Sequence, residues 1–108
     1  MAPVVVVATM KAKPESVDLV RKACTDAADA VHAEPGCQLY SVHEDGAGTF
    51  VFVEQWADRD ALAAHSAAPA VATLFGTVGE HLDEAPDIKM LAPVPAGDPA
   101  KGRLRADG

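Results

Sequence analysis

The chain is poor in aromatic residues, in basic residues and in cysteine, and it has no Asn. Three Phe, one Tyr and one Trp are its aromatic residues, and nine Lys and Arg stand against sixteen Asp and Glu. The resulting net charge of -7 opposes binding to nucleic acid or to an anionic membrane surface. The basic cluster of Lys101, Arg103 and Arg105 lies near the C-terminus, where it is weak evidence for a partner. We therefore expect no nucleic-acid partner and no membrane partner.

Long apolar runs are also missing. The β-branched run Val4-Val5-Val6-Val7 is too short for a signal peptide, and no segment approaches the roughly 20 apolar residues of a membrane span. The two cysteines, Cys24 and Cys37, are too few for a metal motif. A disulfide between them is possible in principle, but two reduced thiols are the simpler interpretation. These features favour a cytoplasmic protein without a bound metal.

The patterns that are present alternate between strand and helix over one domain, which we place at residues 1–94. Apolar residues recur at helical spacing after Pro14, and Glu34-Pro35-Gly36 ends that helix. An acidic, glycine-rich turn at 44–48 predicts a hairpin between its two flanking strands. The predicted strands are 4–10 (buried on both faces), 37–43, 49–56 and 86–93. The predicted helices are one that carries the apolar residues of 17–31 and ends before Glu34, a short one that Asp58 caps and that runs to His65, and one that carries 71–82.

The order β-α-β-β-α-β is that of a ferredoxin-like α+β fold, with a four-stranded antiparallel sheet and helices on one face. The other face carries Val51 and Val53, which are too apolar to face water. Pairing two such sheets face to face would cover them, so we expect a homodimer. The Pro- and Gly-rich residues 95–108 are expected to form a flexible C-terminal tail.

The strand from Phe50 to Trp56 concentrates three of the five aromatic residues in seven positions. Side chains alternate between the faces of a strand, so Phe50, Phe52, Glu54 and Trp56 share one face. An apolar face with one carboxylate is unusual, because a buried carboxylate is costly unless it is paired. The sequence therefore predicts a functional site on this face, next to the helix that carries His65.

Several segments together resemble the antibiotic biosynthesis monooxygenase domain family, over residues 4–93. They are Glu34-Pro35-Gly36-Cys37, Tyr40, the run Phe52 to Asp58, and Ala61 to His65. The resemblance implies a dimeric α/β barrel of ferredoxin-like subunits. It also implies an enzyme that oxygenates a quinol, anthrone or related polyphenol with O2 and without a cofactor.

On this resemblance, three residues are candidates for catalysis and four for binding a flat aromatic substrate. Histidine titrates near neutrality, so His65 could accept the substrate proton. Glu54 could orient a donor or take the proton itself if burial raises its pKa. The catalytic candidates are His65, Trp56 and Glu54, and the substrate-binding candidates are Phe52, Phe50, Tyr40 and Phe75.

Each candidate also has a structural interpretation. Trp56 could pack in the core or in a dimer interface. His65 could interact with the C-terminal end of its helix. For Glu54, a structural ion pair with Arg59 or Lys89 is the favoured interpretation.

Two further functions stay open, a haem- or small-aromatic-binding protein and a non-catalytic dimeric module. Haem-degrading relatives resemble the family but carry an Asn on the first strand, where this chain has Val7-Ala8-Thr9-Met10. Some anthrone-oxygenating members have an Asn where Phe52 stands. Surface positions are expected for His32, His43 and His81.

Overall fold

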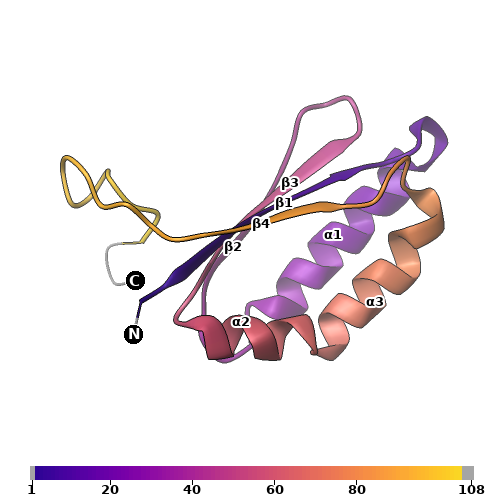
Figure 1. Ribbon diagram of the computed structural model, residues 1–108. Helices are drawn as coiled ribbons and strands as arrows, with labels where there is room; N and C mark the ends of the chain where they lie inside the picture. The colour runs from indigo at the N-terminus through magenta and orange to yellow at the C-terminus, as the bar shows by residue number, and fades with distance from the viewer. Residues whose placement is uncertain (1, 106–108) are drawn as a thin grey trace.

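The computed structural model describes residues 2–105, which form one sheet with helices against it (Figure 1). The elements are β1 (Val4–Lys11), a 3-10 turn η1 (Pro14–Ser16), α1 (Val17–Val31), β2 (Cys37–Glu44), β3 (Thr49–Trp56), α2 (Arg59–Ser66), α3 (Pro69–Val78), a second 3-10 turn η2 (Gly79–His81) and β4 (Asp87–Leu91). The strand order is β2-β3-β1-β4, and all three pairings are antiparallel. The predicted ferredoxin-like α+β fold is confirmed.

The core lies between the sheet and the helices, and the sequence periodicity explains its composition. Val20, Cys24, Ala27 and Val31 of α1 are buried against the sheet, as their spacing predicts. On β3 the alternating residues Phe50, Phe52, Glu54 and Trp56 are all at most 4% exposed, so the predicted shared face points into the molecule. The hairpin of β2 and β3 also forms as predicted.

Three predicted boundaries or environments are wrong in detail. The last helix does not continue to residue 82, because α3 ends at Val78 and the chain tightens into η2. The last strand spans Asp87–Leu91 rather than 86–93, since prolines flank it at both ends and lack the N–H that a ladder needs. The first strand is buried on one face only: Val6 and Met10 are buried, while its other residues are half-buried or exposed.

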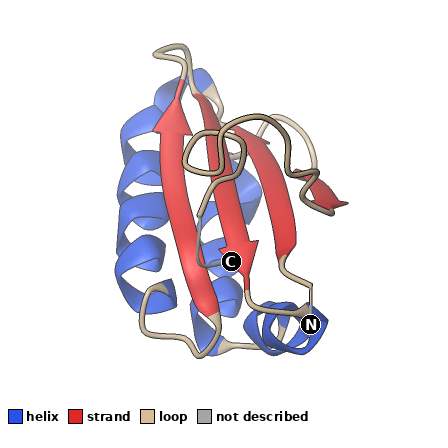
Figure 2. Cartoon of the chain, turned by 90° about the vertical axis from the view of Figure 1, so that its left-hand side faces the viewer, coloured by secondary structure: helices blue, strands red, loops and turns tan. Residues whose placement is uncertain are grey.

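The face of the sheet away from the helices carries Val51 and Val53, which are half-buried, and Gln55, which is buried. The Gln55 side-chain amide donates to Gln38 Oε1 over 2.8 Å. Residues 95–105 fold back across this side of the sheet, where the Arg105 guanidinium donates to the carbonyl of Gln38 (Figure 2). The segment beyond β4 therefore contacts the edge strand β2 at the opposite side of the sheet.

Within residues 2–105 no single helix is both long and apolar enough to cross a membrane. Arg59–Ser66 and Pro69–His81 pass that test only when taken together, as a pair bent by 49°.

Candidate functional site

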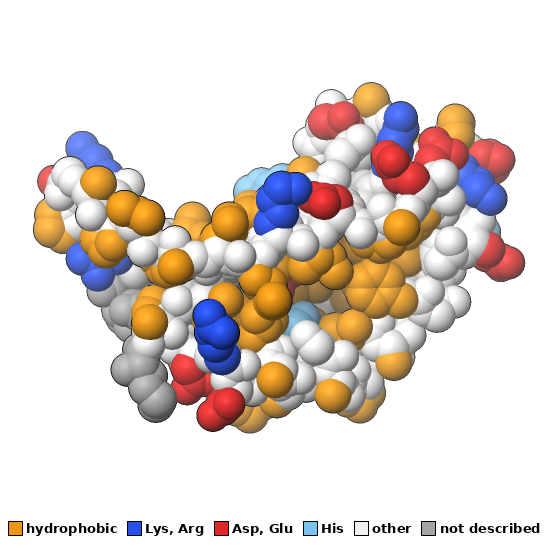
Figure 3. Space-filling model, viewed as in Figure 1, with side chains coloured by type: hydrophobic (Ala, Val, Ile, Leu, Met, Phe, Trp, Pro, Cys, Tyr) orange, Lys and Arg blue, Asp and Glu red, His pale blue; other side chains and the backbone are white. Residues whose placement is uncertain are grey.

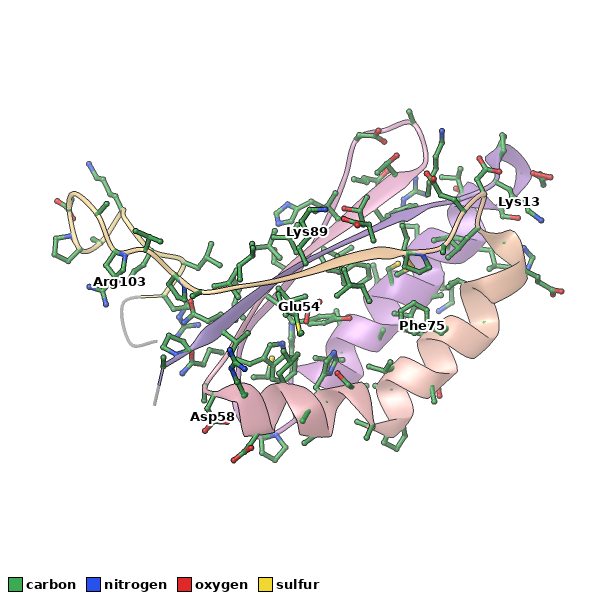
Figure 4. All side chains as sticks on the ribbon, in the orientation of Figure 1. Lys13, Glu54, Asp58, Phe75, Lys89 and Arg103 are labelled. Carbon is green, nitrogen blue, oxygen red and sulfur yellow. The ribbon has the colours of Figure 1, made fainter. Side chains whose placement is uncertain are left out.

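A cavity of about 200 Å³ lies between the sheet and the helices α2 and α3. In Figure 3 it is seen as a hollow below β4, bordered by hydrophobic side chains and with a histidine inside it. Figure 4 shows Glu54 and Phe75 pointing into the space from the sheet and from α3. Its lining residues are Val6, Ala8, Met10, Tyr40, Phe52, Glu54, Leu62, His65, Ser66, Val71, Leu74, Phe75, Ile88 and Met90.

Two rows of side chains across the four strands form the sheet side of this cavity. The pairing register aligns Tyr40, Glu54, Val6 and Met90 in one row, and Val42, Phe52, Ala8 and Ile88 in the next. Ala8 ends at its Cβ beside the much larger Phe52, which leaves space above it. At the edge strand, Ile88 and Met90 are 55% and 69% exposed, so the cavity opens beside β4.

Glu54 is the one carboxylate in this lining, and its side chain is 6% exposed. Its Oε1 accepts a hydrogen bond from Trp56 Nε1 at 3.0 Å. The ion pair predicted for it with Arg59 or Lys89 is wrong, because Glu54 points toward the helices while Lys89 pairs with Asp87. The indole N–H compensates part of the cost of burying the carboxylate.

The position of His65 follows from the start of α2. Asp58 caps this helix, accepting from the N–H of Ala61 at 2.8 Å, as predicted. His65 lies three residues after Leu62, so both side chains share the helix face that lines the cavity. Instead of interacting with the helix C-terminus, the imidazole places Nδ1 2.8 Å from Glu34 Oε1.

Aromatic contacts on two sides fix the plane of the His65 ring. It stacks on Trp56, with ring centroids 4.3 Å apart and planes 28° apart. Tyr40 meets it edge-on at 5.7 Å and also packs edge-on against Phe52. With the ring held this way, Nε2 lies 3.9 Å from Glu54 Oε1, which is too long for a direct hydrogen bond.

The apolar surroundings change the acid–base properties of two cavity residues. Burial raises the pKa of Glu54; the hydrogen bond from Trp56 and the nearby His65 oppose this, and the charge of Glu34 adds to it. Burial, reinforced by the charge of Glu54, also raises the pKa of Tyr40. Tyr40 therefore keeps its proton at neutral pH and can donate a hydrogen bond, but it is a poor base.

The structure brings five of the seven predicted site residues to the cavity wall: Tyr40, Phe52, Glu54, His65 and Phe75. Trp56 does not line the cavity. It lies behind the wall, where it contacts both Glu54 and His65.

Phe50 lies apart from the cavity, two positions along β3 from Phe52. Its ring is 1% exposed, and the Arg21 guanidinium lies 5.8 Å from its centroid. The structure therefore places Phe50 in the core rather than in a binding position.

Glu34 contacts a cavity residue but was not among the site residues predicted from the sequence. It entered as part of the stop after α1 and of the segment that resembles the family, with no role of its own, yet its carboxylate contacts His65 across 31 positions of sequence. Its place in the Glu34-Pro35-Gly36 motif was the available signal. Ile88 and Met90 at the cavity mouth were also missed, although their alternation on β4 puts them on the same face.

The two cysteines are free thiols in the described part of the chain. Cys24 is buried in the core, and burial raises its pKa to about 11. No cluster of three or more His, Cys, Asp or Glu side chains within residues 2–105 is suited to hold a metal ion.

The fold and the cavity define a class of protein: a ferredoxin-like α+β domain with an aromatic, carboxylate- and histidine-containing cavity between sheet and helices. Residues 3–75 match the family model described as antibiotic biosynthesis monooxygenase. That match covers well over half of the chain, and the chain therefore belongs to this family.

Individual relatives agree with the assignment. The curated protein named "Putative monooxygenase Rv0793" from Mycobacterium tuberculosis is 30% identical over 95 residues, covering 86% of this chain and 93% of the relative. The solved structure of Rv0793 superposes with a TM-score of 0.82 at 26% identity, covering 90% of this chain and 100% of that one. A crystal structure titled antibiotic biosynthesis monooxygenase gives a TM-score of 0.80 at 30% identity, covering 85% and 99%.

Proposed function

We propose that this protein is a cofactor-independent monooxygenase that oxygenates a small quinol, anthrone or related polyphenol with O2. The observation that carries the proposal is the pair of His65 and Glu54 on the wall of a largely apolar cavity. An apolar pocket with few polar groups is the usual form of a small-molecule site. A non-catalytic module with Phe52, Trp56 and Glu54 tightly packed would have no such cavity.

The two polar groups are spaced to hold one hydroxyl group. His65 Nε2 and Glu54 Oε1 are 3.9 Å apart, so a phenol oxygen could lie about 2.8 Å from each. It would donate its single proton to Nε2, and it would accept a hydrogen bond from Glu54 when that carboxyl group, whose pKa is raised by burial, is protonated. In this position His65 accepts the phenolic proton, and Tyr40 is able to donate a hydrogen bond to the developing oxyanion. Phe52 and Phe75 would enclose the flat ring and exclude water.

The substrate itself supplies the electrons in the proposed reaction. Its phenolate reduces O2, and the two combine as a peroxide on a ring carbon. Cleavage of the O–O bond leaves one oxygen as a carbonyl and releases the other as water. The substrate thus loses two hydrogens and gains one oxygen, and the water carries those two hydrogens.

The size of the cavity narrows the substrate. Its volume of about 200 Å³ lies below the roughly 300–1,000 Å³ typical of drug-sized ligands. We therefore favour compounds of one to three fused rings over larger polycycles. The same volume argues against haem as the ligand.

We also propose that the chain acts as a homodimer through the sheet face away from the cavity. Val51 and Val53 on that face are half-buried and apolar, and they alternate along β3 with the buried residues that face the helices. A second sheet packed against them would remove this surface from water.

Oxygen uptake by protein freed of metal and cofactor tests the activity, with a panel of hydroquinones and anthrones. We expect uptake by the wild type and a rate about 100-fold or more lower in His65→Ala, which removes the proton acceptor. Trp56→Phe keeps a ring behind His65 but removes the N–H bonded to Glu54, so a smaller loss is expected. No uptake with any compound of the panel would contradict the proposal.

Ligand binding can be followed separately through Trp56, the only tryptophan of the chain, because it stacks on a cavity residue. Ala8→Phe should fill the cavity and abolish the ligand-induced fluorescence change, while circular dichroism stays that of a folded protein. The matched control is Ala72→Phe, an exposed position on α3. Unchanged binding by Ala8→Phe would show that the ligand does not occupy this cavity.

A further inference from the structure

Glu34 has no part in the mechanism proposed above, yet it forms the shortest polar contact of His65. Glu34 Oε1 and His65 Nδ1 are 2.8 Å apart, and the two side chains are only 15% and 8% exposed. A carboxylate buried to this extent is costly unless a partner compensates for it. The contact is therefore a built part of the site rather than a surface ion pair.

The turn that carries Glu34 is fixed against α2, the helix that carries His65. Gly36 has a φ of 81°, and a Cβ placed on it would lie 2.4 Å from the Cβ of Ala61. Its carbonyl accepts from the N–H of Ala57 at 2.9 Å, just before α2 begins. Glycine is thus needed for both the backbone conformation and the close approach. These two contacts set the distance between Glu34 and the imidazole.

The contact also determines which nitrogen of His65 carries the proton. An ionised carboxylate can only accept hydrogen bonds, so Nδ1 must be the protonated nitrogen of the neutral ring. Nε2 then has its lone pair free and faces Glu54 and the cavity. In the other tautomer Nε2 would carry a hydrogen and could not accept a proton from a substrate.

We propose that Glu34 is the positioning residue of His65: it holds the tautomer that presents an unprotonated Nε2 to the cavity. Once His65 has taken a proton, the carboxylate also stabilises the imidazolium. On this proposal, the Glu34-Pro35-Gly36 turn holds the His65 ring in position and does not only end α1. The kinetic part of the inference rests on the proposed function, whereas the tautomer does not depend on any activity.

Nitrogen-15 NMR of histidine-labelled protein tests the tautomer directly. At a pH where His65 is neutral, we expect the wild type to show Nδ1 protonated and Nε2 unprotonated. Glu34→Gln can still accept from Nδ1 through its amide oxygen and should keep this pattern. Glu34→Ala should lose it, since Nε2–H can then turn to Glu54. Glu84→Ala, on an exposed loop, is the matched control.

Either of two NMR results would overturn the inference: a wild type with Nε2 protonated, or a Glu34→Ala variant with an unchanged pattern. Urea denaturation of each variant shows which of them are folded. If Glu34→Ala does not fold, the wild-type tautomer and Glu34→Gln still decide the question.

Kinetics separate positioning from a merely structural role. We expect kcat to fall by about 10- to 100-fold in Glu34→Ala with KM nearly unchanged, and less in Glu34→Gln. The pH profile of kcat/KM should also move, because Glu34, Glu54 and Tyr40 are the titratable groups that face His65. Loss of stability with an unmoved profile would contradict the role. The expected NMR pattern with no oxygenation by any variant would instead count against the proposed function alone.

Discussion

At the scale of single residues, Glu54 is a buried carboxyl group whose burial affects stability. It lies in the wall of an apolar cavity, and burial raises its pKa despite the hydrogen bond from Trp56. A carboxyl group whose pKa is raised by folding holds its proton to a higher pH in the folded chain than in the unfolded chain. Between the two pKa values the folded state binds more protons, so its stability falls as the pH rises.

Glu54→Gln should therefore gain stability relative to the wild type as the pH rises above the range in which a free glutamate titrates, because the wild type loses stability there and the amide does not titrate. The amide oxygen of Gln can still accept from Trp56, so the packing is preserved. Urea denaturation at several pH values gives the difference. Exposed Glu84→Gln controls for the change in net charge. A constant difference between wild type and Glu54→Gln over this range would contradict the argument.

The residues predicted from the sequence were those whose chemistry is visible in a local pattern. Glu54 stands out because strand alternation puts it on an aromatic face, and His65 because it ends one of the segments that resemble the family. Glu34 could not be selected in this way, since its partner lies 31 positions away and only the folded turn brings them together. The ion pairs predicted for Glu54 were wrong for the same reason. The position of a residue in a strand predicts which face of the sheet its side chain is on, but not which side chain it will contact.

At the scale of elements, the turn between α1 and β2 sets the geometry of the site. Gly36 combines a positive φ with close packing on Ala61 of α2. Gly46, in the hairpin between β2 and β3, has the same φ of 81° with no atom within 4 Å of an added Cβ. The pair separates the cost of the backbone conformation from the cost of the contact.

Gly46→Ala should cost only the left-handed backbone penalty, about 1–2 kcal/mol. Gly36→Ala should cost that and, in addition, about 1–3 kcal/mol for overpacking against Ala61. Gly36→Ala with Ala61→Gly should recover most of the second part. Chemical denaturation of the four proteins gives the comparison. Equal losses in the two single variants would show that the turn does not press on α2.

The boundaries of some elements follow from local sequence patterns, whereas the end of α3 does not. The periodicity of α1 and the turn residues around β2 and β3 are strong signals, and those elements form as predicted. The end of α3 is weaker, because the apolar pattern runs on through Leu82 while the backbone tightens at Gly79. Leu82 is buried all the same, through a bridge with Ala12 next to β1. Leu82 is therefore apolar because a tertiary contact buries it, and not because it belongs to the helix.

At the scale of the whole molecule, the two faces of the sheet carry different sets of side chains. The face toward the helices carries the core and the cavity. The opposite face carries Val7 and Val53, which pair across β1 and β3, near the middle of the sheet. The sequence indicated this division from alternation alone, but the position of residues 95–105 beside β2 depends on long-range contacts that no local pattern reports.

The proposed homodimer makes Val53 a sensitive position. A lysine there would have to be buried in the interface between two sheets, where an unpaired charge is costly. Val53→Lys should therefore convert a dimer into a monomer, while the cavity on the other face stays intact. Size-exclusion chromatography with light scattering measures the mass, and ligand-induced Trp56 fluorescence reports the cavity. Ala72→Lys, exposed on α3, should leave the dimer unchanged. A wild type with the mass of a single chain at all concentrations would rule out this assembly.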